Sequence, residues 1–544
     1  MDEYVKTANL EAISEIKAVI NPFPGLRPFG IEESHLFFGR EGQSEEVLLK
    51  LSKNRFVAVI GASGTGKSSL IYCGLVPILY GGFIANAGSQ WKIIATRPGG
   101  GPIANMAESV VKSVYKDEAD KEKQMKASFF DAMLRRSSLG LLEVLRNLPI
   151  AKDENILMLV DQFEELFRYR LSRKGQEAVN ESEAFVKLLV EAVNQTEIPV
   201  YIVITMRSDF IGECSNYQEL TTLINRSNYL IPQMTRNDFR DAIVGPVAVG
   251  NAKIETALVQ ELLNDVGDNP DQLPILQHAM MRTWDYWLNN SDRDKEVGLS
   301  EYEAIGKMEK ALSEHANEAF DELSEEGQRI CEVLFKTITE KGADNRGVRR
   351  PTRLEDIADI SAADIDELKT VIEKFRAPGR SFVTPSSEVP LTKDSIIDLS
   401  HESLMRIWNR LKVWVDEEAS AVQMYLRLSE ASALFQEGKT GLWRPPDLQI
   451  ALNWEKKQKP TLAWAQRHNP AFERAMVFLH TSAKEYEADE LNKIKLQKRA
   501  LQRSRMIAAI LGVAAVISLG IMIYAQMQST EAFKQRMAAI KSSV

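Results

Sequence analysis

The sequence predicts a mixed α/β protein built on a parallel sheet, followed by a mostly helical middle and one membrane-type helix. A short apolar run at 56–60 leads into "GASGTGKSS" and then into a helical pattern. Further apolar runs of strand length follow at 91–98, 156–160 and 200–210. Strands that alternate with helical segments indicate βαβ units and a parallel sheet. An apolar stretch at 505–527 is long enough to cross a bilayer.

The composition of the chain limits its class. A chain of 544 residues should divide into roughly three or four domains. The net charge of −9 argues against nucleic acid as the main ligand, because phosphate binding needs a basic surface. The three cysteines have neither metal-ligand spacing nor a disulfide framework, which fits a reducing cytoplasm. Residues 1–20 lack the apolar core of a signal peptide, and their periodicity predicts a short amphipathic helix.

The stretch 61–69 has the composition and spacing of a phosphate-binding loop. Its glycines let backbone N–H groups surround phosphate oxygens, and the next helix points its positive end at them. We expect Lys67 to reach the β- and γ-phosphates and the Ser68 hydroxyl to ligate Mg²⁺. The predicted phosphate-binding residues are Gly61, Ala62, Ser63, Gly64, Thr65, Gly66, Lys67, Ser68 and Ser69.

A magnesium site needs a second oxygen ligand at the end of a neighbouring strand. Asp161 supplies it, directly after the apolar run at 156–160. Because the run at 91–98 falls between the phosphate loop and Asp161 in the sequence, we expect an extra strand between those two strands. This arrangement is typical of additional-strand P-loop NTPases. The guanine-specific Asn-Lys-x-Asp motif is missing, which favours ATP and ADP as ligands.

Hydrolysis requires a group that activates water, and this class usually has a carboxylate immediately after the metal-binding aspartate. Gln162 occupies that position, and Glu164 and Glu165 follow it. One glutamate could act as the general base, or Gln162 could only orient the water. Both glutamates could also simply begin the next helix. Arg207, at the end of a later strand-like run, is placed to sense a γ-phosphate or to form a surface ion pair. Slow hydrolysis and tight nucleotide holding both stay open. The candidate catalytic residues are Asp161, Glu164, Glu165 and Arg207.

Several longer stretches resemble one family. They are, in order, "NPFPGLRPFGIEESHLFFGREGQSEEVLLKL", "LVDQFEELF", "ITMRSDF", "DNPDQLPILQHAMMRTW" and "LSHESLMRIWNRLKVWV". With the phosphate loop, they resemble the blocks of bacterial STAND NTPases, the signal-transduction ATPases with numerous domains. The resemblance covers about residues 21–485. It is to the novel-STAND type, which is often fused to β-propeller or other repeat sensors.

This resemblance implies roles for individual residues. Arg40 matches the family's Gly-Arg-Glu motif beside the nucleotide. Pro274 matches the Gly-x-Pro motif that packs on the adenosine, with Gln272 in place of the glycine. Arg207 matches the γ-phosphate sensor. His401 matches the winged-helix histidine that reaches the β-phosphate in resting, ADP-bound members, and its alternative role is to cap the following helix.

The resemblance and the local patterns divide the chain into successive parts. Residues 235–324 have the helical periodicity of a small lid, and 325–415 have the element order of a winged helix. Two β-like runs around a Pro/Ser-rich loop at 380–400 would form the wing. The expected parts are an N-terminal helix (1–20), an NTPase core (21–234), the lid (235–324), the winged-helix domain (325–415), a helical extension with a basic end (416–504), the membrane helix (505–527) and a tail (528–544).

A winged helix raises the alternative of DNA binding, because this region is locally basic. Packing against the nucleotide domain is the better interpretation, since the chain as a whole is acidic. The basic residues concerned are Arg346, Arg349, Arg350, Arg353, Lys374, Arg376 and Arg380.

The apolar stretch at 505–527 is predicted to cross a membrane once. Residues 506–524 would rise about 28 Å as a helix, close to the roughly 30 Å of a bilayer's hydrocarbon core. Several Lys and Arg residues lie just before the stretch, whereas the only basic residues after it are Lys534, Arg536 and Lys541. This asymmetry places the NTPase on the cytoplasmic side of the inner membrane. The alternative is a buried core helix.

The sequence therefore predicts a membrane-anchored ATP/ADP switch. As the resemblance implies, ADP would hold it closed, and ATP would permit rearrangement and homo-oligomerisation. The switch would relay a signal in bacterial signalling or anti-phage defence, through a trigger, sensor or effector partner that the sequence does not identify. Two alternatives are a winged-helix transcription regulator and a membrane-tethered remodelling ATPase. The second needs rapid turnover, against which Gln162 argues.

Overall fold

The computed structural model describes residues 21–83, 88–151, 154–172, 176–267, 272–342 and 347–541. The chain divides into two compact units, one up to Glu418 and one from Ala419, and each is described by itself. The helix predicted at 1–20 lies outside the described residues, and so does Arg346.

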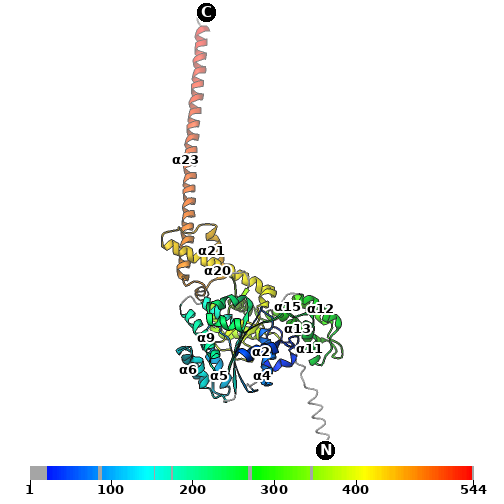
Figure 1. Ribbon diagram of the computed structural model, residues 1–544. Helices are drawn as coiled ribbons and strands as arrows, with labels where there is room; N and C mark the ends of the chain where they lie inside the picture. Colours follow the sequence, from blue (N-terminus) through cyan, green and yellow to red (C-terminus); the bar gives the residue numbers. More distant parts are fainter. Residues whose placement is uncertain are drawn as a thin grey trace, which may run out of the picture. The chain divides into compact units, whose positions relative to one another are not determined.

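A five-stranded parallel sheet forms the centre of the first unit (Figure 1). Its three central strands are buried along almost their whole length, as expected for a parallel sheet that is covered on both faces. The strand order is β2-β3-β4-β1-β5. The strands are β1 (Phe56–Gly61), β2 (Trp91–Thr96), β3 (Asn155–Val160), β4 (Val200–Arg207) and β5 (Asn228–Leu230).

The strand order confirms the predicted extra strand and corrects its identity. One strand does separate β1, which carries the phosphate loop, from β3, which leads to Asp161. That strand is β4, whereas the run at 91–96 forms β2 at the edge of the sheet. Neighbours in the sequence need not be neighbours in a parallel sheet, because each connection crosses over through a helix.

Alternate side chains of the strands pack into two separate hydrophobic cores, one on each face of the sheet. Phe56, Ala58 and Ile60 belong to one cluster of buried apolar residues, and Val57 and Val59 belong to the other, as a side-chain period of two requires. The first cluster is completed by α5 (Pro102–Val114), α6 (Asp120–Arg136), α7 (Gly140–Arg146), α8 (Glu165–Ser172), α9 (Gln176–Asn194), η3 (Ser208–Asn216) and α10 (Gln218–Arg226). The second is completed by α2 (Gln43–Asn54), η2 (Leu70–Leu75) and α4 (Val76–Tyr80), and η2 directly follows α3 (Lys67–Ser69).

The helix that follows the phosphate loop is held tightly against α2. A Cβ on Gly74 would lie 2.0 Å from the Ser44 hydroxyl oxygen, so a larger residue here would displace the Ser44 side chain. The helix is π-helical over η2, between α3 and α4. A short helix, η1 (Ile31–Leu36), also contacts η2. This packing fixes the first turn, which carries Lys67 and Ser68.

Residues 235–324 form a helical bundle around its own core, in which Trp284 and Tyr302 are fully buried. The Tyr302 hydroxyl donates to Asp265 (2.6 Å) and accepts the Met308 N–H (2.9 Å), so this buried polar group is satisfied. The helices are α11 (Arg236–Val249), α12 (Thr256–Val266), α13 (Leu273–Asn290), α14 (Leu299–Ala304) and α15 (Lys307–Asp321).

Residues 325–415, the 325–415 segment below, combine helices with short strands around Phe335, Phe375 and Trp408. The two β-like runs around the Pro/Ser-rich loop pair antiparallel, as β9 with β10, and β8 joins them on the other side of β10. The elements are α16 (Glu325–Thr337), β6 (Thr339–Lys341), β7 (Gly347–Arg349), β8 (Thr352–Arg353), α17 (Leu354–Ser361), α18 (Ile365–Arg376), β9 (Val383–Thr384), β10 (Ile396–Leu399) and α19 (Ser403–Ile407).

Helices make up the second unit. Tyr425 is fully buried, lies against Trp454 and Trp464, and donates its hydroxyl to the Asn469 carbonyl (2.6 Å). These aromatic side chains therefore form a small core. The unit begins within α20 (Asn409–Gln436) and continues with α21 (Asp447–Gln458), α22 (Leu462–Gln466) and α23 (Phe472–Lys541).

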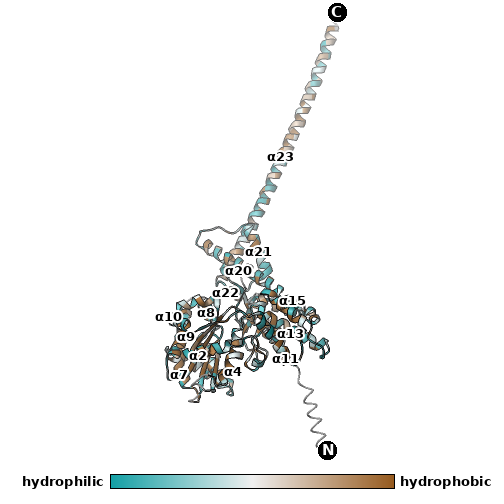
Figure 2. Ribbon diagram, turned by 45° about the vertical axis from the view of Figure 1, so that its right-hand side comes forward, coloured by the Kyte–Doolittle hydropathy of each residue, from teal (hydrophilic) through white to brown (hydrophobic). Residues whose placement is uncertain are grey.

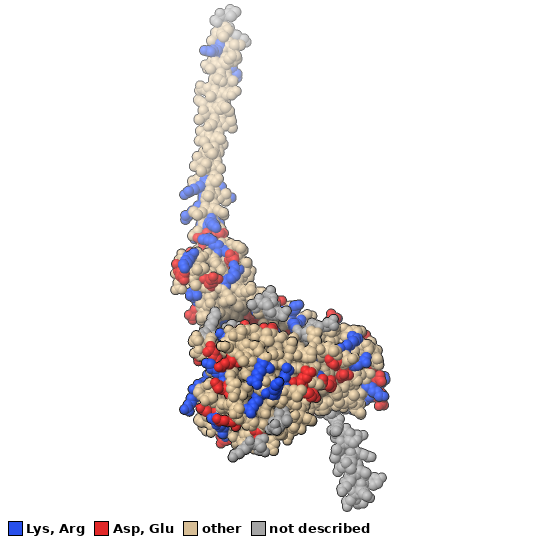
Figure 3. Space-filling view, in the orientation of Figure 1, with Lys and Arg blue, Asp and Glu red and all other residues tan. Residues whose placement is uncertain are grey.

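The predicted membrane segment lies within α23, a single helix of 70 residues. Figure 2 shows hydrophobic colours along its middle, and Figure 3 shows that this part carries no Lys, Arg, Asp or Glu, with basic side chains on both sides. None of its most apolar window is buried, unlike a core helix. Among the described residues, α23 is the one helix that is long and apolar enough to cross a membrane.

Candidate nucleotide-binding site

The phosphate loop begins at the carboxyl end of β1 and ends in the first turn of α3. Gly64 and Gly66 have φ angles of 75° and 83°, in the left-handed region that favours glycine. A Cβ on Gly64 would lie 3.2 Å from the Pro274 ring and 3.4 Å from Cε1 of His401. The structure thus places Pro274 and His401, from two later parts of the chain, directly against the loop.

Lys67 is held inside this loop. Its Nζ donates to the carbonyl oxygens of Gly61 (3.1 Å) and Ala62 (2.7 Å), and Thr65 Oγ1 donates to the same Ala62 oxygen (2.9 Å). Burial lowers the pKa of Lys67, while the Glu164 carboxylate opposes that shift. A phosphate oxygen would be a stronger acceptor than these carbonyls, because it carries charge.

Asp161 lies directly after β3, and its side chain is only 1% exposed. Oδ1 accepts from Ser68 Oγ (2.7 Å) and Thr205 Oγ1 (2.7 Å), and Oδ2 accepts from Arg97 Nε (3.2 Å) and Nη2 (2.9 Å). Burial alone would raise the pKa of Asp161, but Arg97 and the two hydroxyl groups lower it overall. The hydroxyl and carboxylate oxygens of Ser68 and Asp161 are hard ligands that fit Mg²⁺.

Gln162 adopts a backbone conformation that is unusual for a side chain of its kind. Its φ is 58°, in the left-handed region. Its N–H donates to Thr205 Oγ1 (2.9 Å), and its Oε1 accepts from Arg349 Nη2 (3.0 Å). Arg349 also pairs with Asp398 (3.0 Å). The conformation is therefore maintained both by the sheet and by the 325–415 segment.

The two candidate glutamates have different surroundings. Glu164 lines the cavity beside the phosphate loop, accepts the Arg207 N–H (3.2 Å), and has a pKa raised by burial. Glu165 is not among the described residues that line this cavity. It accepts the Gly99 N–H (3.0 Å), and burial raises its pKa to about 7. The geometry thus assigns Glu164 to the cavity and Glu165 to support of the loop after β2.

Arg207 reaches the 325–415 segment from the end of β4. Its Nη1 lies 2.7 Å from each carboxylate oxygen of Glu402, and its Nη2 donates to Asp209 (2.7 Å). Glu402 directly follows His401, and all three of Arg207, His401 and Glu402 line the same cavity as the phosphate loop.

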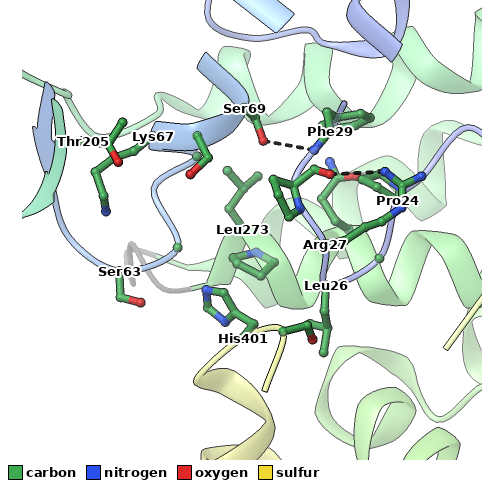
Figure 4. A pocket seen from close by; sticks show the side chains of 18 of the residues that line it. Pro24, Leu26, Arg27, Phe29, Ser63, Lys67, Ser69, Thr205, Leu273 and His401 are labelled. Carbon is green, nitrogen blue, oxygen red and sulfur yellow. Dashed lines mark hydrogen bonds between the residues drawn. The ribbon is translucent and has the colours of Figure 1, made fainter. Parts of the chain in front are cut away.

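His401 is oriented by its own backbone turn. The Ser403 N–H donates to Nδ1 of His401 (3.1 Å), so a neutral ring carries its proton on Nε2 and donates there. Figure 4 shows the ring directed toward the phosphate loop near Ser63. The contact with Ser403 also gives a backbone N–H at the start of α19 an acceptor. The capping alternative and a role at the loop are therefore compatible.

The opposite side of the cavity is formed by the segment that precedes η1 and by α13. Pro24, Leu26 and Leu273 close it, and the Phe29 N–H donates to Ser69 Oγ (3.2 Å) (Figure 4). Arg40 is 6% exposed. Its guanidinium donates to the carbonyl oxygens of Thr65 and Pro232 (2.8 Å each), so it supports the loop backbone.

The sequence did not single out some residues of this site. Arg97 and Thr205 both contact Asp161, and Glu402 engages Arg207. Arg97 carried a usable signal, because it directly follows a strand-like run, as Asp161 does. The sequence marks Arg349 only as a basic residue for the DNA alternative, whereas in the structure it contacts Gln162.

A family model described as Novel STAND NTPase 1 matches residues 22–441. The chain belongs to this family. The matched range includes the phosphate loop, Asp161, Arg207 and His401. A search of curated proteins found no match to this STAND NTPase.

Solved structures resemble this STAND NTPase only distantly. Cdc6p of Pyrobaculum aerophilum is 12% identical, covers 70% of this chain and 94% of its own, and has a TM-score of 0.32. The ORC1 protein of Aeropyrum pernix in complex with DNA is 13% identical, with 70% and 93% covered and a TM-score of 0.35. The RuvB Holliday junction branch migration motor of Thermotoga maritima is 13% identical, with 70% and 97% covered and a TM-score of 0.28. These likenesses are too distant to carry a functional argument.

The raised pKa of Glu165 makes stability depend on pH. Its ordinary pKa is 4.5, and the folded protein raises it to about 7. Below the ordinary pKa, the Glu165 carboxyl is protonated in both the folded and the unfolded protein and does not lower the free energy of unfolding. As the pH rises from there through about 7, ionisation of the buried carboxyl lowers the free energy of unfolding. Glu165→Gln keeps an oxygen for the Gly99 N–H but carries no charge. We expect it to be more stable than wild type by about 1–3 kcal/mol near pH 8, with little difference near pH 4.5.

Urea unfolding midpoints of the full chain at both pH values measure this difference. Glu177→Gln, on the exposed side of α9, is the matched control and should follow wild type at both. Equal midpoints for Glu165→Gln and wild type near pH 8 would contradict the assignment.

Proposed function

We propose that this STAND NTPase is a nucleotide-operated switch that binds ATP and ADP in the cavity beside the phosphate loop. The phosphates would lie on residues 61–69, with Mg²⁺ held by Ser68 and Asp161. The adenosine would lie on the side of Arg40 and Pro274, where Leu26 and Leu273 offer apolar contacts. The charged part of the cavity, with Lys67 and Arg207, suits polyphosphate.

The observation that carries the switch is the ion pair between Arg207 and Glu402. Both N–H···O distances from Nη1 are 2.7 Å, and the two side chains are 18% and 15% exposed. Arg207 is the residue expected to sense a γ-phosphate, and its guanidinium cannot make its full set of contacts to Glu402 and to a γ-phosphate together. ATP would therefore compete with the closed arrangement, whereas ADP would leave it intact.

The elements of the 325–415 segment support the predicted winged-helix domain, with β8, β10 and β9 as its sheet. Its contacts with Gln162 and Arg207 favour a regulatory role at the cavity over DNA binding. The basic residues behind the DNA alternative that lie in the described part of the chain are engaged in ion pairs: Arg349 with Asp398, Arg350 with Glu340, Arg353 with Asp394, Lys374 with Glu322, Arg376 with Glu373 and Arg380 with Glu322. A helical lid at 235–324 would bring Pro274 to the loop.

Glu402→Gln tests the switch. The variant keeps the shape of the side chain but removes the charge that holds Arg207. We expect ADP to dissociate about tenfold faster or more, because a charge-assisted contact that stabilises the closed form is lost. Release of a fluorescent ADP analogue from the full chain measures this rate.

Glu340→Gln is the control for that experiment. It removes a carboxylate of the same segment that pairs with Arg350 at 3.6 Å, away from the cavity residues, and should leave the rate unchanged. An ADP release rate in Glu402→Gln equal to wild type would rule out this ion pair as the closing contact.

We propose Glu164 as the general base for slow hydrolysis, because it lines the cavity and has a pKa raised by burial. Glu164→Gln should reduce ATP turnover by about 100-fold or more while ADP binding persists. Glu165→Gln should reduce turnover far less, since Glu165 contacts Gly99. Phosphate release under saturating ATP measures both. Equal losses in the two variants would show that neither glutamate has the specific role.

We also propose that α23 anchors the switch in the inner membrane, with the NTPase on the cytoplasmic side, and that ATP-bound copies assemble to relay a signal. The support is the uncharged stretch of α23 and the basic residues that precede it.

Arginine within the span tests this anchoring. Val513→Arg with Ile517→Arg should move the chain from the carbonate-resistant membrane fraction to the soluble fraction, because each arginine costs about 2.5–3.5 kcal/mol at the centre of a bilayer. Leu496→Arg with Leu501→Arg, which adds the same charges before the span, should stay in the membrane fraction. Carbonate-resistant membrane retention of the span variant would contradict anchoring by this helix.

A further inference from the structure

The cationic group that pairs with Asp161 in this structure is the guanidinium of Arg97. All of the carboxylate's strong acceptor positions are used: Oδ1 by the hydroxyl groups of Ser68 and Thr205, and Oδ2 by Nε and Nη2 of Arg97. The ion pair measures 2.9 Å, with Asp161 buried and Arg97 about half exposed. Arg97 also lines the cavity, beside Lys67 and Ser68.

The sheet places Arg97 at this position. β2 and β3 are parallel neighbours, with Thr96 opposite Val160. Arg97 and Asp161 are therefore the first residues beyond two adjacent strand ends, at the same edge of the sheet.

The loop that carries Arg97 is anchored on both sides. Asn105 Nδ2 donates to the carbonyl oxygens of Arg97 (3.2 Å) and Pro98 (2.9 Å), and the Gly99 N–H donates to Glu165 (3.0 Å). A loop held by the start of α5 and by α8 keeps the guanidinium aimed at the carboxylate.

We propose that Arg97 is an internal cation that takes the place of Mg²⁺ at Asp161 in the closed protein. This STAND NTPase then holds ADP without metal, and metal enters only when Arg97 leaves Oδ2. The inference rests on the proposed nucleotide site and deepens it, because it names what controls metal entry.

The chemistry of the two cations explains why they exclude each other. Mg²⁺ requires near-octahedral oxygen ligands and keeps several of its waters. Both a direct bond to Asp161 and a bond through water need a lone pair that the guanidinium now occupies. Arg97 already compensates the buried charge of Asp161, so the closed site has no uncompensated carboxylate to attract a divalent ion. The exposed part of the Arg97 side chain gives it a route out of the site.

The test compares the affinity of the full chain, in detergent, for a fluorescent ADP analogue in EDTA and in excess Mg²⁺. For wild type, we expect the two dissociation constants to agree within about threefold. For Arg97→Gln, we expect affinity in EDTA to fall about tenfold or more, because Asp161 is left uncompensated beside the phosphates, and Mg²⁺ to restore most of it.

Two further variants make the result specific. Arg97→Lys keeps the charge and should depend on Mg²⁺ less than Arg97→Gln does. Arg146→Gln removes a surface arginine that pairs with Glu197 and should behave as wild type. Mn²⁺ titration followed by electron paramagnetic resonance gives a second measure: in the presence of ADP, Arg97→Gln should bind the ion more tightly than wild type.

The outcomes are distinguishable. Wild-type ADP affinity that rises tenfold or more with Mg²⁺ would overturn the proposal and leave the nucleotide site standing. An Arg97→Gln protein with wild-type affinity in both conditions would do the same. Loss of ADP binding in Lys67→Ala confirms that binding occurs at the phosphate loop. Absence of ADP binding in wild type itself would overturn both the proposed function and this inference.

Discussion

The arrangement of the first unit depends on one buried carboxylate at the carboxyl edge of its sheet. Asp161 is charged and almost fully excluded from water, so every one of its oxygens needs a donor. The sheet order supplies these donors from both sides. β4 brings Thr205, β2 leads to Arg97, and the helix after β1 brings Ser68. A different strand order would leave this charge unpaired.

The same edge of the sheet is where the later parts of the chain converge. His401 and Pro274 lie against Gly64, and Arg349 and Glu402 contact Gln162 and Arg207. The contacts of Arg349 with Gln162 and of Glu402 with Arg207 are between charged or strongly polar groups, and all four side chains line the cavity. An interface of this kind is stable only while each buried charged group has a partner of opposite charge or a hydrogen-bond partner. A ligand that brings several negative charges into the cavity changes that match directly, which makes this site suited to a two-state response.

Local sequence was enough to predict the phosphate loop, Asp161 and four of the five strands of the parallel sheet, because glycine spacing and apolar runs report local structure. The short strand β5 was not predicted. It misassigned which strand separates β1 from β3, because crossover connections hide strand order. It could not distinguish Glu164 from Glu165, since consecutive residues at a helix start diverge only once the neighbouring loop is placed. The partners Arg97 and Glu402 depend on strand register and on a contact across almost 200 residues of sequence. The contact of Glu402 with Arg207 is a tertiary feature without a local sequence pattern, whereas Arg97 has only the local signal of its place directly after a strand-like run.

The continuity of α23 has a mechanical consequence. Its first turns pack into the second unit through Ala475, Phe478 and Leu479, and the same helix then runs without a break into the apolar stretch that starts at Met506. The intervening residues span about 40 Å at 1.5 Å per residue. A continuous helix of this length is stiff in torsion, so a rotation of its packed end is delivered to its apolar end as the same rotation. Inserting a single residue between them would advance the apolar face by about 100° while lengthening the rod by only about 1.5 Å. The helix therefore fixes the rotational orientation of its apolar face relative to its packed end more strictly than it fixes the distance between them.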